Sequence, residues 1–281
     1  MNAETPSLAA RGRAMDIALP IAGLIRWRSA FRQFLVRAIA RRYRGSALGF
    51  VWSLAVPLAT LGIYGFVFGT VMQSRWDAGS GAPVDFTLNL FAGLLVFWLM
   101  ADALTQAPSV IIEHANLVKK AVFPLEILPA VAVGNAAFHA AVNAGVLIAG
   151  MVIMGHQLSV TILWLPIVLL PFAILITGIA WLLSALGVFF RDLMPLIGLA
   201  LTGALFLSPV FYPISRLPPA VADWIQFNPI TEVVDQVRCV MLEGRAPEFD
   251  ALAIYLIVAW IVAGCGLAVF RRLRDSFADV L

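Results

Sequence analysis

The sequence predicts an all-α integral membrane protein with six transmembrane helices. Hydrophobic residues make up 62% of the 281 residues, charged residues only 12%, and the mean hydropathy is +0.94. A soluble domain would carry roughly 25% charged residues. Six apolar stretches reach the length of about 20 residues that a spanning helix needs, and the basic residues concentrate in alternate segments between them. We therefore expect an N-terminal region over residues 1–44 and a transmembrane domain over residues 45–281.

The N-terminal region is expected to stay in the cytoplasm. It contains nine arginines, and no apolar core of about 7–15 residues follows the first of them, so we expect no cleavable signal. Within "SAFRQFLVRAIARRYRGS", Phe31, Phe34, Leu35 and Ala38 share one helical face. The pattern predicts an amphipathic helix in the membrane interface with its apolar side chains in lipid, either as a simple anchor or as part of a gate. The arginines expected to contact anionic lipid headgroups are Arg41, Arg42 and Arg44.

The six predicted spans are residues 48–72, 87–107, 128–154, 160–188, 193–212 and 251–270. The fourth is long and contains Pro166 and Pro171, so we expect it to tilt and bend. With the N-terminal region inside, the cytoplasmic segments hold 15 of the 19 Lys and Arg residues. Nine precede the first span, two follow the second, one follows the fourth and three follow the sixth. This asymmetry is what the positive-inside rule requires, and six spans place both termini in the cytoplasm.

The cytoplasmic loop "EHANLVKKAVFP" contains the only two lysines of the chain, Lys119 and Lys120. Leu117 and Val118 begin a helical pattern, and Pro124 ends it. Two readings of the loop are open. The lysines either anchor the end of a span at the lipid headgroups, or belong to a short helix that binds a cytoplasmic partner.

Polar side chains repeat every four residues on one face of the third span, at Asn135, His139 and Asn143. The spacing indicates either hydrogen bonding across a helix interface or the polar wall of a conduit. Aromatic residues gather toward the outer ends of the first and fifth spans, including Tyr64 and Phe206. They are typical of an aromatic belt at the lipid interface, although aromatic faces also stack on sugar rings.

Residues 214–250, between the fifth and sixth spans, predict two further helices on the outer side. Pro218 and Pro219 suit the first turn of one helix, and Asn228-Pro229 suits a break and a restart. In the second helix an apolar stripe excludes Glu232, Asp235 and Arg238. The residues of that stripe are Ile230, Val233, Val234, Val237 and Met241. The two helices are expected either to close an outer exit or to lie on the surface as a cap.

The chain lacks a nucleotide-hydrolysing motif. No G-x-x-x-x-G-K-[ST] occurs, so any ATP hydrolysis must be performed by another subunit. The three histidines are too scattered to predict a metal site. An enzyme would have to rely on Asp102 and Glu126, the acids at or near span ends, and a membrane-embedded transferase acting on lipid-linked sugars is the alternative that they leave open.

Four segments, in order, resemble the membrane subunits of ABC-2 type exporters for lipid-linked polysaccharides and related polyol-phosphate polymers. They are "RRYRGSALGFVWSLAVPL" from residue 41, "NLVKKAVFPLEILP" from residue 116, "FFRDL" from residue 189, and "LSPVFYPISRLP" from residue 207 followed by "NPIT" at 228. One position departs from the family pattern: Leu125 stands where many relatives have a basic residue, which affects the ion pair expected around Glu126.

The resemblance implies a permease rather than an enzyme, working as two copies of this chain with two cytoplasmic ATPase subunits that hold the ATP and magnesium. It implies no cofactor in this chain, no nucleic-acid partner, and a place in the bacterial inner membrane. The loop around residues 113–122 would be a coupling helix that docks on the ATPase. The residues expected at that contact are Glu113, His114, Asn116, Lys119 and Lys120, with Arg191 and Asp192 as a second contact.

The expected substrate is a polysaccharide on undecaprenyl diphosphate or a similar lipid, with O-antigen as the first candidate and capsule or wall polymers as alternatives. An exporter of another amphiphile, such as a drug or a lipid, is the second expectation. The resemblance implies that the first and fifth spans line the channel and that the helices within 214–250 form the outer gate. We also expect the substrate to enter at the cytoplasmic leaflet, where Arg41, Arg42 and Arg44 attract its headgroup. The candidate channel residues are Tyr64, Phe68, Phe206 and Tyr212.

Overall fold

The computed structural model describes residues 26–44, 49–72, 76, 83–118, 123–190 and 192–281, and these residues contain helices and no strand. The longer helices are α3 (Arg28–Tyr43), α4 (Trp52–Tyr64), α5 (Pro83–Gln106), α7 (Ile127–Ile153), α8 (Leu165–Phe189), α9 (Leu193–Phe206), α11 (Pro229–Met241) and α12 (Phe249–Arg274). The shorter ones are α6 (Ala115–Val118), α10 (Pro219–Gln226) and α13 (Phe277–Val280).

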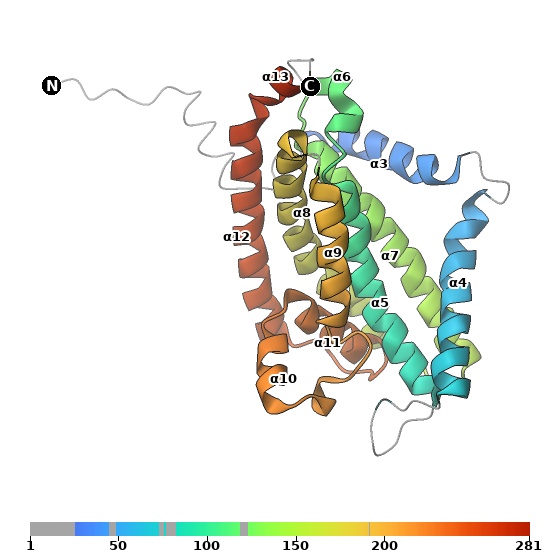
Figure 1. Cartoon of the computed structure of the whole chain (residues 1–281). Coiled ribbons are helices and arrows are strands. Elements are labelled where there is room, and N and C mark those ends of the chain that lie inside the picture. Colours follow the sequence, from blue (N-terminus) through green and yellow to red (C-terminus); the bar gives the residue numbers. More distant parts are fainter. Residues whose placement is uncertain (1–25, 45–48, 73–75, 77–82, 119–122, 191) are drawn as a thin grey trace.

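The long helices form a bundle whose two ends differ (Figure 1). α3, α6 and α13 lie at one end, which we call the α3 end. α10 and α11 lie at the opposite end, which we call the α11 end. The segments predicted to be cytoplasmic and those predicted to be external are therefore separated as the predicted topology requires.

Among the described residues, five helices are long and apolar enough to cross a membrane. They are Gly49–Phe68, Phe86–Gln106, Ile127–Ile153, Val160–Phe189 and Phe249–Arg274. These segments confirm five of the six predicted spans. The first continues beyond α4 as a wider π-helix, Gly65–Val71, and the fourth begins with a 3-10 turn, Val160–Trp164, before Pro166 in the first turn of α8.

The fifth predicted span, residues 193–212, is longer than the helix that forms. α9 ends at Phe206 and has 14 residues, which give a length of about 21 Å, shorter than a hydrocarbon core of about 30 Å. Pro209 and Pro213 explain this end, because proline lacks the amide hydrogen of a helix and also disfavours helical geometry in the residue before it. Apolarity continues past Phe206, but the helix does not.

α8 and α12 pack more closely than ordinary side chains would allow. A Cβ added to Gly178 of α8 would lie 2.6 Å from the Cα of Ala263 in α12. Gly266, one turn further along α12, lies against the carbonyl oxygen of Gly178. Small residues permit such close backbone contact, which is a main source of helix association in lipid.

α3 packs against α7 rather than resting on lipid alone. Its predicted apolar face is half-buried, and Phe31 and Leu35 reach over Gly134 of α7, where an added Cβ would lie 3.1 and 3.3 Å from them. The expectation that this face lies in the lipid boundary is therefore corrected for Phe31 and Leu35. Because Gly134 of α7 has no side chain, these two side chains pack on its backbone.

The two helices predicted between the fifth and sixth spans are both present. Asn228 caps α11, because its side-chain oxygen accepts a hydrogen bond from the amide of Ile230 at 3.0 Å. The same side chain donates to the carbonyl of Leu207 and the hydroxyl of Ser208, which ties α11 to the end of α9. The predicted apolar stripe of α11 is buried throughout.

Candidate functional site

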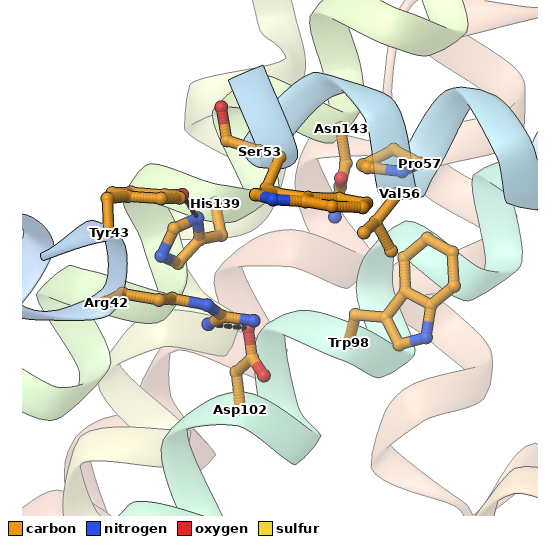
Figure 2. Close-up of a pocket in the computed structure, with 10 residues that line it drawn as sticks. Arg42, Tyr43, Ser53, Val56, Pro57, Trp98, Asp102, His139 and Asn143 are labelled. Carbon is orange, nitrogen blue, oxygen red and sulfur yellow. Dashed lines mark hydrogen bonds and ion pairs between the residues drawn. The ribbon is translucent and has the colours of Figure 1, made fainter. Parts of the chain in front are cut away.

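A cavity of about 410 Å³ lies between four helices in the half of the bundle nearer the α3 end (Figure 2). It is bounded by the last residues of α3, the first turns of α4, and inward faces of α5 and α7. The residues that line it are Arg42, Tyr43, Trp52, Ser53, Val56, Pro57, Trp98, Asp102, His139 and Asn143. We call it the α3–α7 cavity.

One ion pair crosses the α3–α7 cavity. Nη1 of Arg42 donates to Oδ2 of Asp102 at 3.1 Å, so the end of α3 is tied to α5. The two side chains are 48% and 32% exposed, so the pair is partly screened by solvent or lipid headgroups. Arg42 was predicted to contact lipid headgroups, and in this structure its guanidinium already has a carboxylate partner.

The polar strip of α7 forms one wall of the cavity. The Tyr43 hydroxyl and Nδ1 of His139 are 3.2 Å apart, at hydrogen-bonding distance. Nε2 of His139 is buried without a hydrogen-bond partner in the described structure, and so is Oδ1 of Asn135. His139 and Asn143 are each 8% exposed and line the cavity, whereas Asn135 is buried outside it. His139 therefore makes a contact between helices, as one of the two expectations has it, and His139 and Asn143 line a cavity; the wall of a conduit stays a prediction.

The predicted coupling helix is partly described, as a 3-10 turn, Ile112–His114, followed by α6. Glu113 accepts hydrogen bonds from Nη1 of Arg41 at 3.0 Å and from the Ser109 hydroxyl at 2.7 Å. His114 bonds the carbonyl of Val110 at 2.8 Å and packs edge-on against Phe34 of α3. These contacts join the segment to α3, and Asn116 beyond them is exposed.

The same segment packs against a cluster of buried apolar side chains at the α3 end. Ile111 is fully buried there, and Leu117 packs on the cluster's edge. The cluster joins α7, α8, α12 and α13, and its buried members are Ile111, Leu125, Leu128, Trp181, Ala185, Val188, Ala263, Leu267, Phe270 and Phe277. A force applied to residues 112–118 would therefore reach both α3 and the α7–α8–α12 block.

Glu126, which immediately precedes α7, forms ion pairs with two arginines, although the residue before it, Leu125, is apolar and not basic. Its Oε1 accepts from Nη1 of Arg274 at 3.1 Å and lies 3.6 Å from Nε of Arg271. Arg274 also donates to the carbonyl of Phe123. The expected ion pair at Glu126 is thus made with the end of α12.

The two acids that a transferase would need do not share a pocket. Asp102 lines the α3–α7 cavity and pairs with Arg42, whereas Glu126 does not line it and pairs with α12. In the described part of the chain, no group of three or more His, Cys, Asp or Glu side chains could hold a metal ion.

The remaining predicted site residues are divided between surface positions and two aromatic groups. Asp192 and Arg44 are exposed, and Lys119, Lys120 and Arg191 lie outside the described residues. Tyr64 and Phe68 pack toward Phe86 of α5, with 5.2 Å between the Phe68 and Phe86 ring centroids. Phe206 stacks on Phe211 at 5.6 Å, and the Tyr212 hydroxyl donates to the Phe206 carbonyl.

Arg238 of α11 lies in the interior, contrary to its predicted place on the polar side of the helix. It is 4% exposed and donates to the carbonyls of Asn89 at 3.1 Å and Val210 at 3.2 Å. Its guanidinium lies 4.3 Å from the ring centroid of Trp76 and 3.7 Å from Asp235. Burial lowers the pKa of Arg238 to about 10, so it remains charged at neutral pH. It holds α11, α5 and the segment after α9 together.

Residues 29–242 match the family described as ABC-2 type transporter. The O-antigen export system permease protein RfbA of Klebsiella pneumoniae is 30% identical over 241 residues, covering 85% of this chain and 90% of that protein. RfbA of Myxococcus xanthus is 26% identical over 91% of this chain and 96% of its own. The polysialic acid transport protein KpsM of Escherichia coli is 23% identical over 86% of this chain and 92% of its own. The family match runs from α3 to α11 and includes the α3–α7 cavity and residues 112–118, and the chain therefore belongs to the ABC-2 type transporter family.

Proposed function

We propose that this chain is the membrane subunit of an ATP-driven exporter that moves a lipid-linked polysaccharide, with O-antigen as the first candidate, from the cytoplasmic to the outer leaflet of the bacterial inner membrane. The observation that carries this proposal is the similarity, over 85% or more of the chain, to proteins named as O-antigen export permeases. The apolar bundle and the polar cavity between its helices are compatible with an amphiphilic cargo.

The energy for this movement comes from a separate ATPase subunit. Support comes from the absence of a phosphate-binding loop in the sequence and from the position of residues 112–118. That segment is exposed at Glu113 and Asn116, yet it is fixed to α3 through Arg41 and to the bundle through Ile111. Two ATPase copies would press on two such segments, one in each permease, and Asp192 would lie at a second contact. Each permease would respond by moving α3 relative to α7, α8 and α12, the helices joined by the apolar cluster.

Two copies of the chain would enclose the passage. α4 and α9 both expose large apolar side chains that no described residue covers, among them Trp52, Leu58, Leu196 and Leu199. A second copy packed along these helices would bury part of that surface and bring the aromatic groups at Tyr64, Phe68, Phe206 and Tyr212 toward a shared path. Both termini would be cytoplasmic, in agreement with the distribution of basic residues.

A deletion strain tests the proposed cargo. Loss of the gene should abolish the surface polysaccharide and accumulate the lipid-linked polymer inside the cell, and a plasmid copy should restore export. Mass spectrometry of the extracted lipid fraction identifies the polymer. Accumulation of a drug or simple lipid, with surface polysaccharide unchanged, would contradict the proposal and favour export of another amphiphile.

A charge reversal tests the proposed contact with the ATPase. Replacing Lys119 and Lys120 by glutamate should stop export while the permease remains inserted and folded, because the partner surface would meet the wrong charge. Export at the wild-type rate would remove these lysines from the contact.

A further inference from the structure

The α3–α7 cavity has unused hydrogen-bonding groups but little charge to offer a ligand. Arg42 is the single cation among its described lining residues, and Asp102 neutralises it at 3.1 Å. A diphosphate carries several negative charges and is normally bound by unpaired arginine or lysine side chains. The lining is therefore poorly suited to a diphosphate and better suited to a neutral polar group.

Two buried groups on α7 supply the missing hydrogen bonds. Nε2 of His139 is buried with no partner, and the Asn143 side chain makes no hydrogen bond with any described residue. The two residues are one turn apart on the same face of α7, and both line the cavity. Leaving the buried Nε2 of His139 without a partner is unfavourable, and a hydrogen bond from a ligand hydroxyl would remove that penalty. Hydroxyls both donate and accept, so they suit either tautomer of His139 and either end of the Asn143 amide.

Aromatic rings complete the lining. Trp98, Trp52 and Tyr43 come from three different helices around the polar wall, and Trp98 faces the cavity from the side opposite His139 (Figure 2). An indole ring offers a wide apolar face with a polar edge, which matches the apolar face and hydroxyl rim of a sugar ring. The volume of about 410 Å³ falls within the range of roughly 300–1,000 Å³ that small-molecule sites occupy.

The cavity also lies where a lipid-linked substrate would arrive. It is bounded by the first turn of α4 and by Asp102, four residues before the end of α5 at the α3 end. Arg44 is exposed one residue beyond α3, and it makes no ion pair with any described residue. A diphosphate could therefore stay near Arg44 at the headgroup level while the attached sugar occupies the space between the helices.

We propose that the α3–α7 cavity binds the sugar residue next to the lipid diphosphate of the substrate, and that it recognises the ring and its hydroxyls rather than the diphosphate. This inference rests on the proposed export of a lipid-linked polysaccharide. In this arrangement His139 and Asn143 make hydrogen bonds to the sugar hydroxyls, and the Trp98 ring stacks on the sugar.

The test compares two probes bound by the complete exporter, permease with ATPase, in phospholipid nanodiscs. One probe is a short-chain polyprenyl diphosphate bearing a single hexose or N-acetylhexosamine, used as a small panel, and the other is the same lipid diphosphate without sugar. The variant is Asn143→Leu, which keeps the branched shape and the number of side-chain heavy atoms, although leucine is larger, and removes no hydrogen bond to a described residue. The matched control is Asn135→Leu, two turns away on the same face of α7 and outside the cavity.

We expect wild type to bind at least one sugar-bearing probe more tightly than the sugarless one. Asn143→Leu should weaken that probe about tenfold and leave the sugarless probe unchanged, and Asn135→Leu should change neither. Equal weakening of both probes would overturn the proposal in favour of a lipid-headgroup site. No effect of Asn143→Leu on either probe would also overturn it, even if the exporter still moves lipid-linked polysaccharide. An exporter that binds neither probe and moves no such polysaccharide would refute the proposed function as well.

Discussion

Arg274, in the last turn of α12, donates a hydrogen bond to Glu126, which immediately precedes α7, at 3.1 Å. The two residues are 148 positions apart in sequence, and their pair joins the start of α7 to the end of α12. Together with the bond from Arg274 to the Phe123 carbonyl, it fixes the end of α12 to the start of α7.

Glu126→Gln should lower the free energy of unfolding by about 1 kcal/mol. A hydrogen bond between charged groups contributes about 1.5–3 kcal/mol, and partial exposure reduces this value. Thermal unfolding in detergent measures the change. A double-mutant cycle with Arg274→Gln should show coupling of about 0.5 kcal/mol or more. The matched control, Arg272→Gln, changes an exposed arginine of the same turn and should have almost no effect. Additive effects at Glu126 and Arg274 would show that the contact is unimportant.

The ion pair between Arg41 and Glu113 should matter for transport and hardly for stability. Both side chains are largely exposed, so the pair contributes at most about 1 kcal/mol. Arg41→Glu should nevertheless separate α3 from residues 112–118 by repulsion and reduce ATP-driven export several-fold. The combination of Arg41→Glu with Glu113→Arg restores opposite charges and should recover most of the export.

Arg32→Glu provides the control for this pair, because Arg32 is an exposed arginine of α3 with no ion pair to a described residue. Export rates and ATP hydrolysis are measured on the same preparations. If the exchanged pair exports no better than Arg41→Glu alone, the contact has no part in transmitting the movement.

Gly266→Ala should destabilise the bundle by about 1–3 kcal/mol, since a methyl group at this position meets the backbone of Gly178, which cannot move aside as a side chain would. Gly264→Ala is the control, because an added Cβ there meets nothing within 4 Å. Chemical or thermal unfolding of the two variants should differ clearly. Similar stabilities would show that α8 and α12 are not packed as described.

Arg238→Gln should cost at least about 2 kcal/mol of stability. It leaves the carbonyls of Asn89 and Val210 with weakened or absent partners in a buried setting. Arg238→Lys should recover little, because a single ammonium does not reproduce the planar guanidinium that reaches both carbonyls and stacks near Trp76. Arg245→Gln, at an exposed arginine of the same region, should change stability by less than about 0.5 kcal/mol. An unfolding midpoint for Arg238→Gln equal to that of wild type would contradict a stabilising role for the bonds from Arg238 to the two carbonyls.

Local patterns were sufficient to predict most helices. The stripe from Ile230 to Met241 is buried as its spacing required, and Asn228 begins α11 as its residue type indicated. The sequence did not predict the end of α9 at Phe206, because the apolar residues continue past it; the local signal for this end is the pair of prolines, Pro209 and Pro213.

Long-range contacts explain the features that the sequence did not predict. Arg238 is buried because Asn89, 149 positions earlier in the chain, offers it a carbonyl, and no local pattern contains that partner. Tyr43 meets His139 across 96 positions, so the α3–α7 cavity could not be assembled from spacing alone. The four-residue repeat of Asn135, His139 and Asn143 was the available signal; His139 and Asn143 line the cavity, whereas Asn135 lies outside it.

The most direct test of the central claim is transport in sealed vesicles reconstituted with the permease alone or with its ATPase. The account predicts that lipid-linked polysaccharide crosses the bilayer only when both subunits and hydrolysable ATP are present, and that a catalytically inactive ATPase abolishes the movement. Equal movement by the permease alone would contradict the proposal that a separate ATPase drives this chain.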